Sequence, residues 1–212
     1  IAIVGAGIVG ICSALYLQRD GHRVTVFDPN SPGSGASSGN SGSIATGLSL
    51  PTVTTSVLRR VPKMLLDQHG PLVIRPRYLP FVVGWLARLA VATRPAKIAK
   101  TARVLGSLLD IAEDAFQPLL SFANAGDLVR SPGRLMLYSN DAGYANSAAL
   151  RMEWERRAVP FRKIDIREVL ELEPALAPVF KHALFLPRAS SVTNPQALVE
   201  RFARAFVHAG GR

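Results

Sequence analysis

The residues of this chain best suited to chemistry stand near its start, where glycines are spaced as in phosphate-binding turns. Gly5, Gly7 and Gly10 form the string G-x-G-x-x-G, and the acid Asp28 follows 18 residues after the last glycine. In a dinucleotide site, the first glycine permits a tight turn and the second lets the backbone approach a pyrophosphate. The third lets a helix pack against a sheet, and the later acid can accept hydrogen bonds from a ribose diol.

A strand, a helix and a second strand must position these residues. An apolar run covers residues 1–4, an amphipathic run continues to residue 20, and residues 24–28 form a second apolar run. Gly21 is a suitable left-handed cap for the helix. The helix N-terminus presents unpaired N–H groups and a partial positive charge to phosphates. This context indicates a dinucleotide site, and the structural alternative is a doubly wound protein with a glycine-rich turn and no ligand.

A segment rich in Ser, Asn and Gly follows the second strand, over residues 29–43. Its composition also suits a flexible linker, but it leaves the strand on the side of the sheet where the dinucleotide is expected. Small residues let the backbone approach a ligand, and Ser and Asn supply hydrogen bonds. We therefore interpret the segment as a binding loop, in which Asn40 is either a ligand contact or a turn former.

The remaining chain alternates helical and strand patterns. Helices are predicted over residues 52–67 with a break at Pro62, 85–90, 97–123 with a kink at Pro118, 148–157, 165–173, and 194–210. Strands are predicted over residues 161–164 and 183–186, and residues 128–130 and 134–138 are expected to pair as a hairpin around residues 131–133. Leu105 is expected on the buried side of the long helix, and Leu198, Phe202 and Phe206 on that of the last one.

These elements indicate an α/β fold, in which a Rossmann-like binding domain is interrupted by an α+β substrate domain. We expect the first part of the binding domain at residues 1–75, the first part of the substrate domain at 76–190, and a return to the binding domain at 191–212. The chain begins within the first strand and ends where a further strand is expected. We therefore expect it to be a fragment of a larger protein.

Composition and charge narrow the possible partners. The 212 residues are 48% hydrophobic and 19% charged, which is typical of a globular protein. The net charge of +10 is compatible with nucleic acid or an anionic membrane, but no basic run is interleaved with aromatic residues, so we expect no nucleic-acid partner. A single cysteine, Cys12, cannot form an internal disulfide and suits the cytoplasm.

The stretch from Trp85 to Arg103 allows two interpretations. The apolar run at residues 79–92 is too short to span a membrane and carries Arg88. Its apolar residues Trp85, Leu86, Leu89 and Val91 lie near the basic residues Arg88, Arg94, Lys97, Lys100 and Arg103, as in a helix lying on a membrane surface. Such peripheral contact with the inner membrane would suit electron delivery to a quinone. The alternative is an ordinary helix that covers the substrate domain with a solvated basic edge.

Other catalytic patterns are absent from the sequence. His22, His69, His182 and His208 lie far apart without metal-ligand spacing, so no metal site is predicted. The serines of the binding loop lack a nucleophile-elbow context, which disfavours hydrolase chemistry. The polar side chains of Arg75, Arg77 and Tyr78 are interpreted as surface groups, and the catalytic residues stay unassigned.

The chain resembles a known flavoprotein superfamily. Residues 3–17, the strand at 24–28 and the loop at 35–42 are similar to the FAD-dependent D-amino acid oxidase superfamily, most of all to its bacterial D-amino acid dehydrogenases. Further similarities lie at residues 70–76, 172–176 and 191–198. The resemblance covers nearly the whole chain and about the first half of a typical member.

The resemblance implies bound FAD. Its pyrophosphate would contact Gly5, Ala6, Gly7, Ile8, Val9 and Gly10, and its adenosine ribose would contact Asp28. The loop residues Ser37, Ser38, Asn40, Ser41, Gly42 and Ser43 would run past the pyrophosphate toward the isoalloxazine. Members often carry Glu at the position of Asp28, and Asp alone would suit NAD equally well, so the loop favours FAD.

The implied reaction is oxidation of the C–N bond of a small amino acid. A hydride leaves Cα for the flavin, and hydrolysis of the imine gives a 2-oxo acid and ammonia, with a quinone or oxygen as electron acceptor. An arginine clamp for the substrate carboxylate is expected from the later part of the protein. The alternatives are an oxidoreductase of the same superfamily acting on glycine, sarcosine or proline, a non-catalytic flavin-binding fragment, and an NAD-dependent dehydrogenase.

Overall fold

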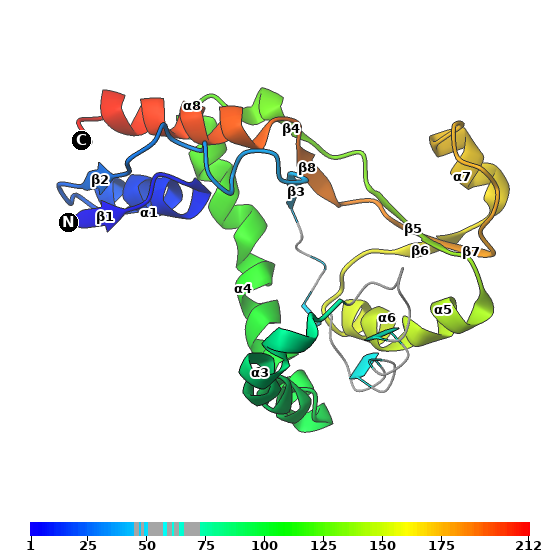
Figure 1. Cartoon of the computed structure of the whole chain (residues 1–212). Coiled ribbons are helices and arrows are strands. Elements are labelled where there is room, and N and C mark those ends of the chain that lie inside the picture. Colours follow the sequence, from blue (N-terminus) through cyan, green and yellow to red (C-terminus); the bar gives the residue numbers. More distant parts are fainter. Residues whose placement is uncertain (45–46, 48, 51–56, 59–60, 62–63, 66–72) are drawn as a thin grey trace. The chain divides into compact units, whose positions relative to one another are not determined.

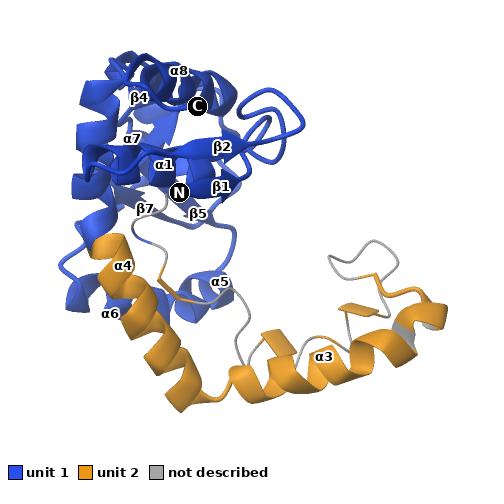
Figure 2. Ribbon diagram, turned by 90° about the vertical axis from the view of Figure 1, so that its left-hand side faces the viewer, with its two compact units in different colours: residues 1–47, 111–212 blue, residues 48–110 orange. Residues whose placement is uncertain are grey.

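The computed structural model describes residues 1–44, 47, 49–50, 57–58, 61, 64–65 and 73–212. The chain divides into two compact units, which Figure 2 colours separately. The first unit comprises residues 1–47 and 111–212, and the second comprises residues 48–110. The predicted boundaries between a binding domain and a substrate domain are drawn by function, and they stay a prediction.

The first unit begins with the predicted strand, helix and strand (Figure 1). Strand β1 (Ala2–Val4) pairs in parallel with β2 (Thr25–Phe27), and helix α1 (Ile8–Arg19) connects them. Gly21 takes a φ of +87° directly after the helix, which confirms the left-handed cap. Two parallel strands connected by a helix form the basic unit of an α/β fold, and the α/β class predicted from sequence is confirmed.

The last helix, α8 (Pro195–His208), begins as predicted from the Asn-Pro pair. The side chain of Asn194 accepts a hydrogen bond from the amide of Ala197 at 3.0 Å, as an N-cap residue does. Beyond the helix, the amide of Arg212 donates to Val24 O at 3.3 Å, and the amide of Val26 donates to Arg212 O at 2.7 Å. Arg212 therefore lies on the free edge of β2 with the bonding pattern of a parallel strand.

The largest core cluster joins α1 and α8. It holds Ile11, Ala14, Leu15, Val24, Leu119, Leu120, Ala123, Leu198, Val199, Phe202 and Phe206, among others. Phe202 is fully buried, and its ring meets that of Phe116 edge to face at 5.8 Å between centroids. Leu198, Phe202 and Phe206 are all buried, so the stripe predicted for the last helix is confirmed.

The hairpin predicted at residues 128–138 is wrong. Strand β4 (Val129–Arg130) pairs with β8 (Ser190–Val192), and β5 (Arg134–Tyr138) pairs with β7 (His182–Leu186). Both pairings are antiparallel, so residues 129–138 run along residues 182–192 as one ribbon that is interrupted at 131–133. Pro132 lacks an N–H group and Gly133 takes a φ of +82°, so the segment interrupts the pairing without reversing the chain.

The sheet of order β5-β7-β6 buries both faces of its central strand. Leu184 and Leu186 of β7 belong to one cluster with Trp154, and Ala183 belongs to a second cluster with Val169. Strand β6 (Arg162–Ile164) forms one edge. The helices are α5 (Asp141–Asn146), α6 (Ala148–Arg156) and α7 (Ile166–Leu172), and the 3-10 helix η2 (Gly126–Leu128) precedes β4. Helix α5, the 3-10 helix η2 and strand β8 have no counterpart among the predicted elements.

The second unit contains the 3-10 helix η1 (Pro76–Tyr78), helix α3 (Leu79–Ala92) and the first part of α4 (Pro95–Phe122). The predicted kinked position, Pro118, lies inside α4. Leu105 is exposed, contrary to the prediction, and the buried positions near it are Ala102 and Gly106. Most of the helix predicted at 52–67 lies outside the described residues.

Candidate functional site

The glycine string forms a turn whose backbone or close contacts disfavour a side chain at each of its three glycines. Gly5 takes a φ of +105° directly after β1, a conformation that L-residues with side chains rarely adopt. A Cβ atom added at Gly10 would lie only 1.9 Å from the carbonyl oxygen of Gly5. A Cβ atom at Gly7 would lie 3.3 Å from the hydroxyl oxygen of Ser37. Glycine at each of these positions therefore has a geometric cause within this structure.

Helix α1 begins at this turn with Gly7 as its N-cap residue and no side-chain cap. The first amides of an α-helix have no acceptor within the helix. The amide of Ile8 instead donates to the hydroxyl oxygen of Ser37 at 3.0 Å. The amides of Val9 and Gly10 follow in the same turn, and the side chain of Val9 is 77% exposed. This end of the helix therefore offers backbone donors to an anion from solvent.

Asp28 lies at the end of β2 and connects two turns. One carboxylate oxygen accepts a hydrogen bond from the amide of Ala6, and the other accepts one from the amide of Asn30, both at 2.8 Å. The bond from Ala6, followed by that from Asn30, lowers the pKa of Asp28. A carboxylate has about four lone-pair sites. Asp28 therefore stays ionised in neutral solution and retains capacity to accept from a ribose.

The Ser/Asn/Gly loop is held to the glycine turn from the inside. Ser37 is buried, and its hydroxyl oxygen accepts from Ile8 while its proton remains available for donation. The amide of Gly33 donates to Ala6 O at 2.9 Å. A Cβ atom at Gly33 would lie 2.9 Å from the Cβ atom of Val199. The loop therefore packs between the glycine turn and α8.

Hydrogen bonds within the loop fix its further course. Asn40 donates to Ser37 O at 3.1 Å, and its side-chain oxygen accepts from the amide of Gly42 at 2.7 Å. In this structure its side chain shapes the loop, and the predicted cofactor contact of Asn40 stays a prediction. Gly42 takes a φ of +62°, and a Cβ atom there would lie 2.2 Å from Val192 O. Ser41 is exposed between these two residues.

Two long-range contacts attach the loop to the later chain. Ser38 donates to the side-chain oxygen of Gln196, the second residue of α8, at 2.9 Å. Ser43 begins strand β3 (Ser43–Ile44), which pairs with β8, and its hydroxyl accepts from the guanidinium of Arg134. Neither Gln196 nor Arg134 was a candidate from sequence. The Asn-Pro-Gln sequence predicts a helix start with Asn as the N-cap residue. No local pattern predicts which group the Gln side chain will contact.

The residues present fit the diphosphate and ribose of a dinucleotide. The glycine turn, the first amides of α1, Asp28 and Ser37 come together, and the missing Cβ atoms leave the backbone accessible. These groups match an anion that needs N–H and O–H donors next to a diol that needs a carboxylate. Ser38, Gly42 and Ser43 lie further along the same loop and join it to α8 and β8, while Asn40 bonds within the loop.

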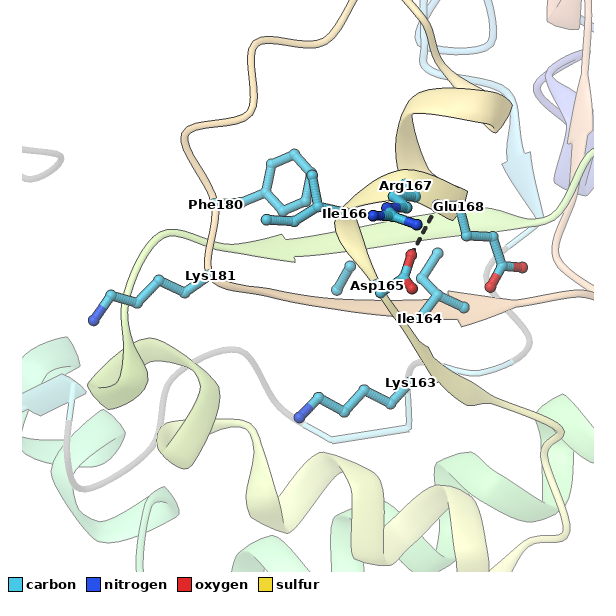
Figure 3. A pocket seen from close by; sticks show the side chains of 9 residues that line it. Lys163, Ile164, Asp165, Ile166, Arg167, Glu168, Phe180 and Lys181 are labelled. Carbon is cyan, nitrogen blue, oxygen red and sulfur yellow. Dashed lines mark hydrogen bonds between the residues drawn. The ribbon is translucent and has the colours of Figure 1, made fainter.

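Apart from the glycine turn, a hollow lies on the β5-β7-β6 sheet, beside β6 and α7 (Figure 3). It measures about 720 Å³, and its charged lining consists of Lys163, Asp165, Arg167, Glu168 and Lys181. Its acids already have partners. Asp165 caps α7 by accepting from the amide of Glu168 at 2.9 Å, and the carboxylate of Glu168 accepts from the guanidinium of Arg162 at 2.8 Å. The hollow contains none of the dinucleotide candidates.

The described part of the chain holds neither a metal site nor a membrane-spanning helix. No group of three or more His, Cys, Asp and Glu residues there could hold a metal ion. Of the helices described, none combines the length and apolar character that crossing a bilayer requires. His182 bonds to Asp141 at 2.8 Å and stacks on Tyr144, so within the described residues its partners are structural.

The fold and site define a dinucleotide-binding protein of the Rossmann type, and comparison with known proteins specifies its family. The family model described as FAD dependent oxidoreductase matches residues 1–212. The chain belongs to this family, which confirms the superfamily inferred from the motifs and FAD as the cofactor.

Named relatives agree with this assignment. The chain is 31% identical over 215 residues to a D-amino-acid oxidase of Bradyrhizobium diazoefficiens, covering 100% of this chain and 51% of the relative. It is 29% identical over 178 residues to a D-amino acid dehydrogenase of Allorhizobium ampelinum, covering 84% of this chain and 42% of the relative. The chain therefore spans about half the length of the curated relatives that it matches.

Solved structures support the fold. The crystal structure of glycine oxidase from Geobacillus kaustophilus matches with a TM-score of 0.61 at 20% identity. The match covers 100% of this chain and 45% of that structure. At this identity the similarity shows a shared α/β fold.

Proposed function

We propose that the whole protein uses FAD to oxidise the C–N bond of a small D-amino acid, giving a 2-oxo acid and ammonia. The family assignment and the two relatives with D-amino acids in their names support this substrate class. The observation that carries the proposal is the hydrogen bond from the Ile8 amide to the Ser37 hydroxyl. It joins the Ser/Asn/Gly loop to the helix N-terminus, so that one site combines both motifs.

The residues of this chain would hold the nonreacting half of the cofactor. The amides of Val9 and Gly10 and the free proton of Ser37 would donate to the pyrophosphate. Asp28 would accept from the adenosine ribose, since its lowered pKa keeps it ionised. The loop from Ser38 to Ser43 would continue toward the isoalloxazine, with its course fixed by Gln196 and β8.

When bound, the isoalloxazine supplies the hydride acceptor for the substrate Cα. The contribution of this chain is to bind and orient that group, and a substrate carboxylate needs a bidentate cation in addition. Because the chain spans about half of its relatives, we propose that this arginine and the catalytic groups come from the remainder of the protein. Arg75 and Arg77 are exposed, and their positions give no reason to assign either of them as the arginine that binds the substrate carboxylate.

Anaerobic titration of the full-length protein tests the proposal. The purified protein should carry a flavin absorbance band, and D-alanine should bleach it while L-alanine does not. Bleaching by glycine, sarcosine or proline instead, with D-alanine inert, would move the substrate to another amine of the same family. A protein that binds FAD but responds to none of these substrates would contradict the proposed activity.

A second experiment concerns the electron acceptor, because one relative is named an oxidase and the other a dehydrogenase. With D-alanine as substrate, oxygen consumption is compared with reduction of an artificial dye under argon. Turnover with oxygen identifies an oxidase, whereas turnover that requires the dye identifies a dehydrogenase.

Replacing Ser37 by Ala tests the observation that carries the proposal. The variant leaves the Ile8 amide without its acceptor and removes a donor to the pyrophosphate, and an unmet buried hydrogen bond costs about 1–3 kcal/mol. We therefore expect FAD affinity to fall by about tenfold or more, measured by fluorescence quenching during reconstitution. Ser34→Ala is the matched control, because the Ser34 hydroxyl is exposed and donates only to Ser31 O within the described contacts.

A further inference from the structure

The second unit carries an uninterrupted block of positive charge. Between Asp67 and Asp110 the sequence contains no acidic residue and has these cations: Arg75, Arg77, Arg88, Arg94, Lys97, Lys100 and Arg103. These side chains are exposed. None of them forms a salt bridge with an acid among the residues that the structure describes. The block thus leaves seven cations exposed within the described residues.

Large apolar side chains lie among these cations on α3. Phe81 is 80% exposed and Trp85 is 60% exposed. Together with Arg88 they follow the spacing i, i+4 and i+7, so they share one face of the helix. The less exposed positions Val82 and Leu86 belong to another face. A helix that turns Phe and Trp outward beside Arg has the composition of an interfacial helix.

The first part of α4 repeats this arrangement with more charge. Its buried positions include Ala102 and Gly106, while Lys97 and Lys100 are exposed on the opposite side. Leu108 is 59% exposed on that side too. Long lysine side chains can bury their stems in apolar surroundings while the ammonium group stays hydrated. Helix α3 and the first part of α4 therefore each present apolar groups and cations together.

We propose that this surface, made of Phe81, Trp85 and Arg88 on α3 and of Lys97, Lys100 and Arg103 on α4, binds the headgroup region of an anionic phospholipid bilayer. The positive block matches anionic headgroups, and the exposed Phe and Trp side chains match the boundary between headgroups and acyl chains. Nucleic acid would use the charge but not an apolar face. The helices lie on the bilayer and do not cross it, since α3 is only 14 residues long.

Vesicle flotation of the FAD-loaded, full-length protein tests the proposal. Vesicles of phosphatidylcholine alone are compared with vesicles that contain phosphatidylglycerol, each at low and high salt. We expect flotation with the anionic vesicles at low salt, and a large loss of bound protein at high salt because salt screens the headgroup charge. Trp85 fluorescence should shift to shorter wavelength on binding, relative to a Trp85→Phe variant.

Two variants separate charge from insertion. Lys97→Glu combined with Lys100→Glu and Arg103→Glu should lower the vesicle partition coefficient by at least about tenfold. Phe81→Ser combined with Trp85→Ser should lower it while keeping its salt dependence. The matched control replaces three exposed arginines of the first unit by Glu, namely Arg167, Arg188 and Arg204. It should leave vesicle binding nearly unchanged. Flavin content and melting temperature verify that each variant folds.

Several results would overturn the proposal. These are absence of flotation at low salt, which would indicate that other parts of the protein cover this surface, and equal binding to neutral vesicles. Equal loss of binding in the control variant would attribute the effect to net charge. None of these results affects the flavin titration, so the membrane surface and the proposed oxidation fail independently.

Discussion

At the scale of single residues, Ser37 determines how the two binding motifs meet. Its hydroxyl is buried, accepts from the amide of Ile8, and lies 3.3 Å from where a Cβ atom of Gly7 would be. One short side chain thus satisfies a helix-end donor and limits the space above the turn. The small size of Gly7 and the hydroxyl of Ser37 are coupled, because a larger residue at either position displaces the other.

The strictest residue of the turn is Gly10. In Gly10→Ala the new Cβ atom would meet the carbonyl oxygen of Gly5, and backbone must shift to relieve it. Overpacking of this kind costs about 1–3 kcal/mol or more, so FAD affinity should fall by about tenfold to a hundredfold. Equilibrium FAD binding measures the loss. Gly35→Ala, in open space within the Ser/Asn/Gly loop, should bind FAD like the unchanged protein.

Cys12 provides a pH-dependent prediction. Burial raises the pKa of its thiol to about 11 from 9.0. Below both values the thiolate should be about a hundredfold scarcer in the folded protein than in the unfolded chain, so alkylation of Cys12 should be correspondingly slow. Peptide mass spectrometry with and without denaturant measures both rates. Rapid alkylation of the folded protein at neutral pH would contradict the burial.

The sign of the linked stability follows from the same pKa. The unfolded thiol ionises first, so the unfolded chain holds fewer protons than the native state between pH 9 and 11. The native state should therefore lose stability as the pH rises through that window, and Cys12→Ala should lose less. Urea denaturation at several pH values gives the comparison.

At the scale of elements, α8 connects the core to the site. Its buried face packs against α1 through Phe202 and its neighbours, while its start holds Ser38 through Gln196. The same helix leads to Arg212, which lies on the edge of β2. A change that displaces α8 should therefore disturb both the core and the Ser/Asn/Gly loop.

Phe202→Ala tests the packing of α8. Removing a fully buried phenylalanine costs about 3–5 kcal/mol of folding free energy. We expect a clearly lower melting temperature and a lower FAD affinity, measured by thermal scans with and without added FAD. Val207→Ala is the control on the same helix, because Val207 is 59% exposed and should change stability by no more than about 0.5 kcal/mol.

At the scale of the whole molecule, stability should be distributed unevenly between the two units. The largest cluster of buried apolar residues belongs to the first unit, whereas several large apolar side chains of the second unit are exposed. Local opening costs least where few apolar groups are buried. The unit with the proposed membrane surface should therefore open more readily than the unit with the binding loop.

Hydrogen exchange of the full-length protein measures this difference. Peptides from residues 79–110 should exchange earlier than peptides from α1 and α8. Removal of FAD should accelerate exchange at residues 5–10 and 28–43, and leave residues 195–208 slower than residues 79–110. Earlier exchange in α1 and α8 than in residues 79–110 would contradict the predicted order.

Local signals in the sequence were enough to predict the βαβ unit, the family, the cofactor and the buried stripe of α8. These depend on signals within about 30 residues: glycine spacing, an acid after the second strand, and helical periodicity. The domain boundaries and the role of each residue of the Ser/Asn/Gly loop remain predictions from the sequence.

Which distant segments contact each other could be read only from the three-dimensional structure. Residues 129–138 pair with 182–192 and not with each other, and Ser38 reaches a glutamine 158 residues away. A strand pattern predicts that a segment will pair with another strand. It does not predict which strand, because the backbone offers the same N–H and C=O groups to every partner. Burial in the complete fold selects among those partners, and it also made Gln196 and Arg134 neighbours of the Ser/Asn/Gly loop.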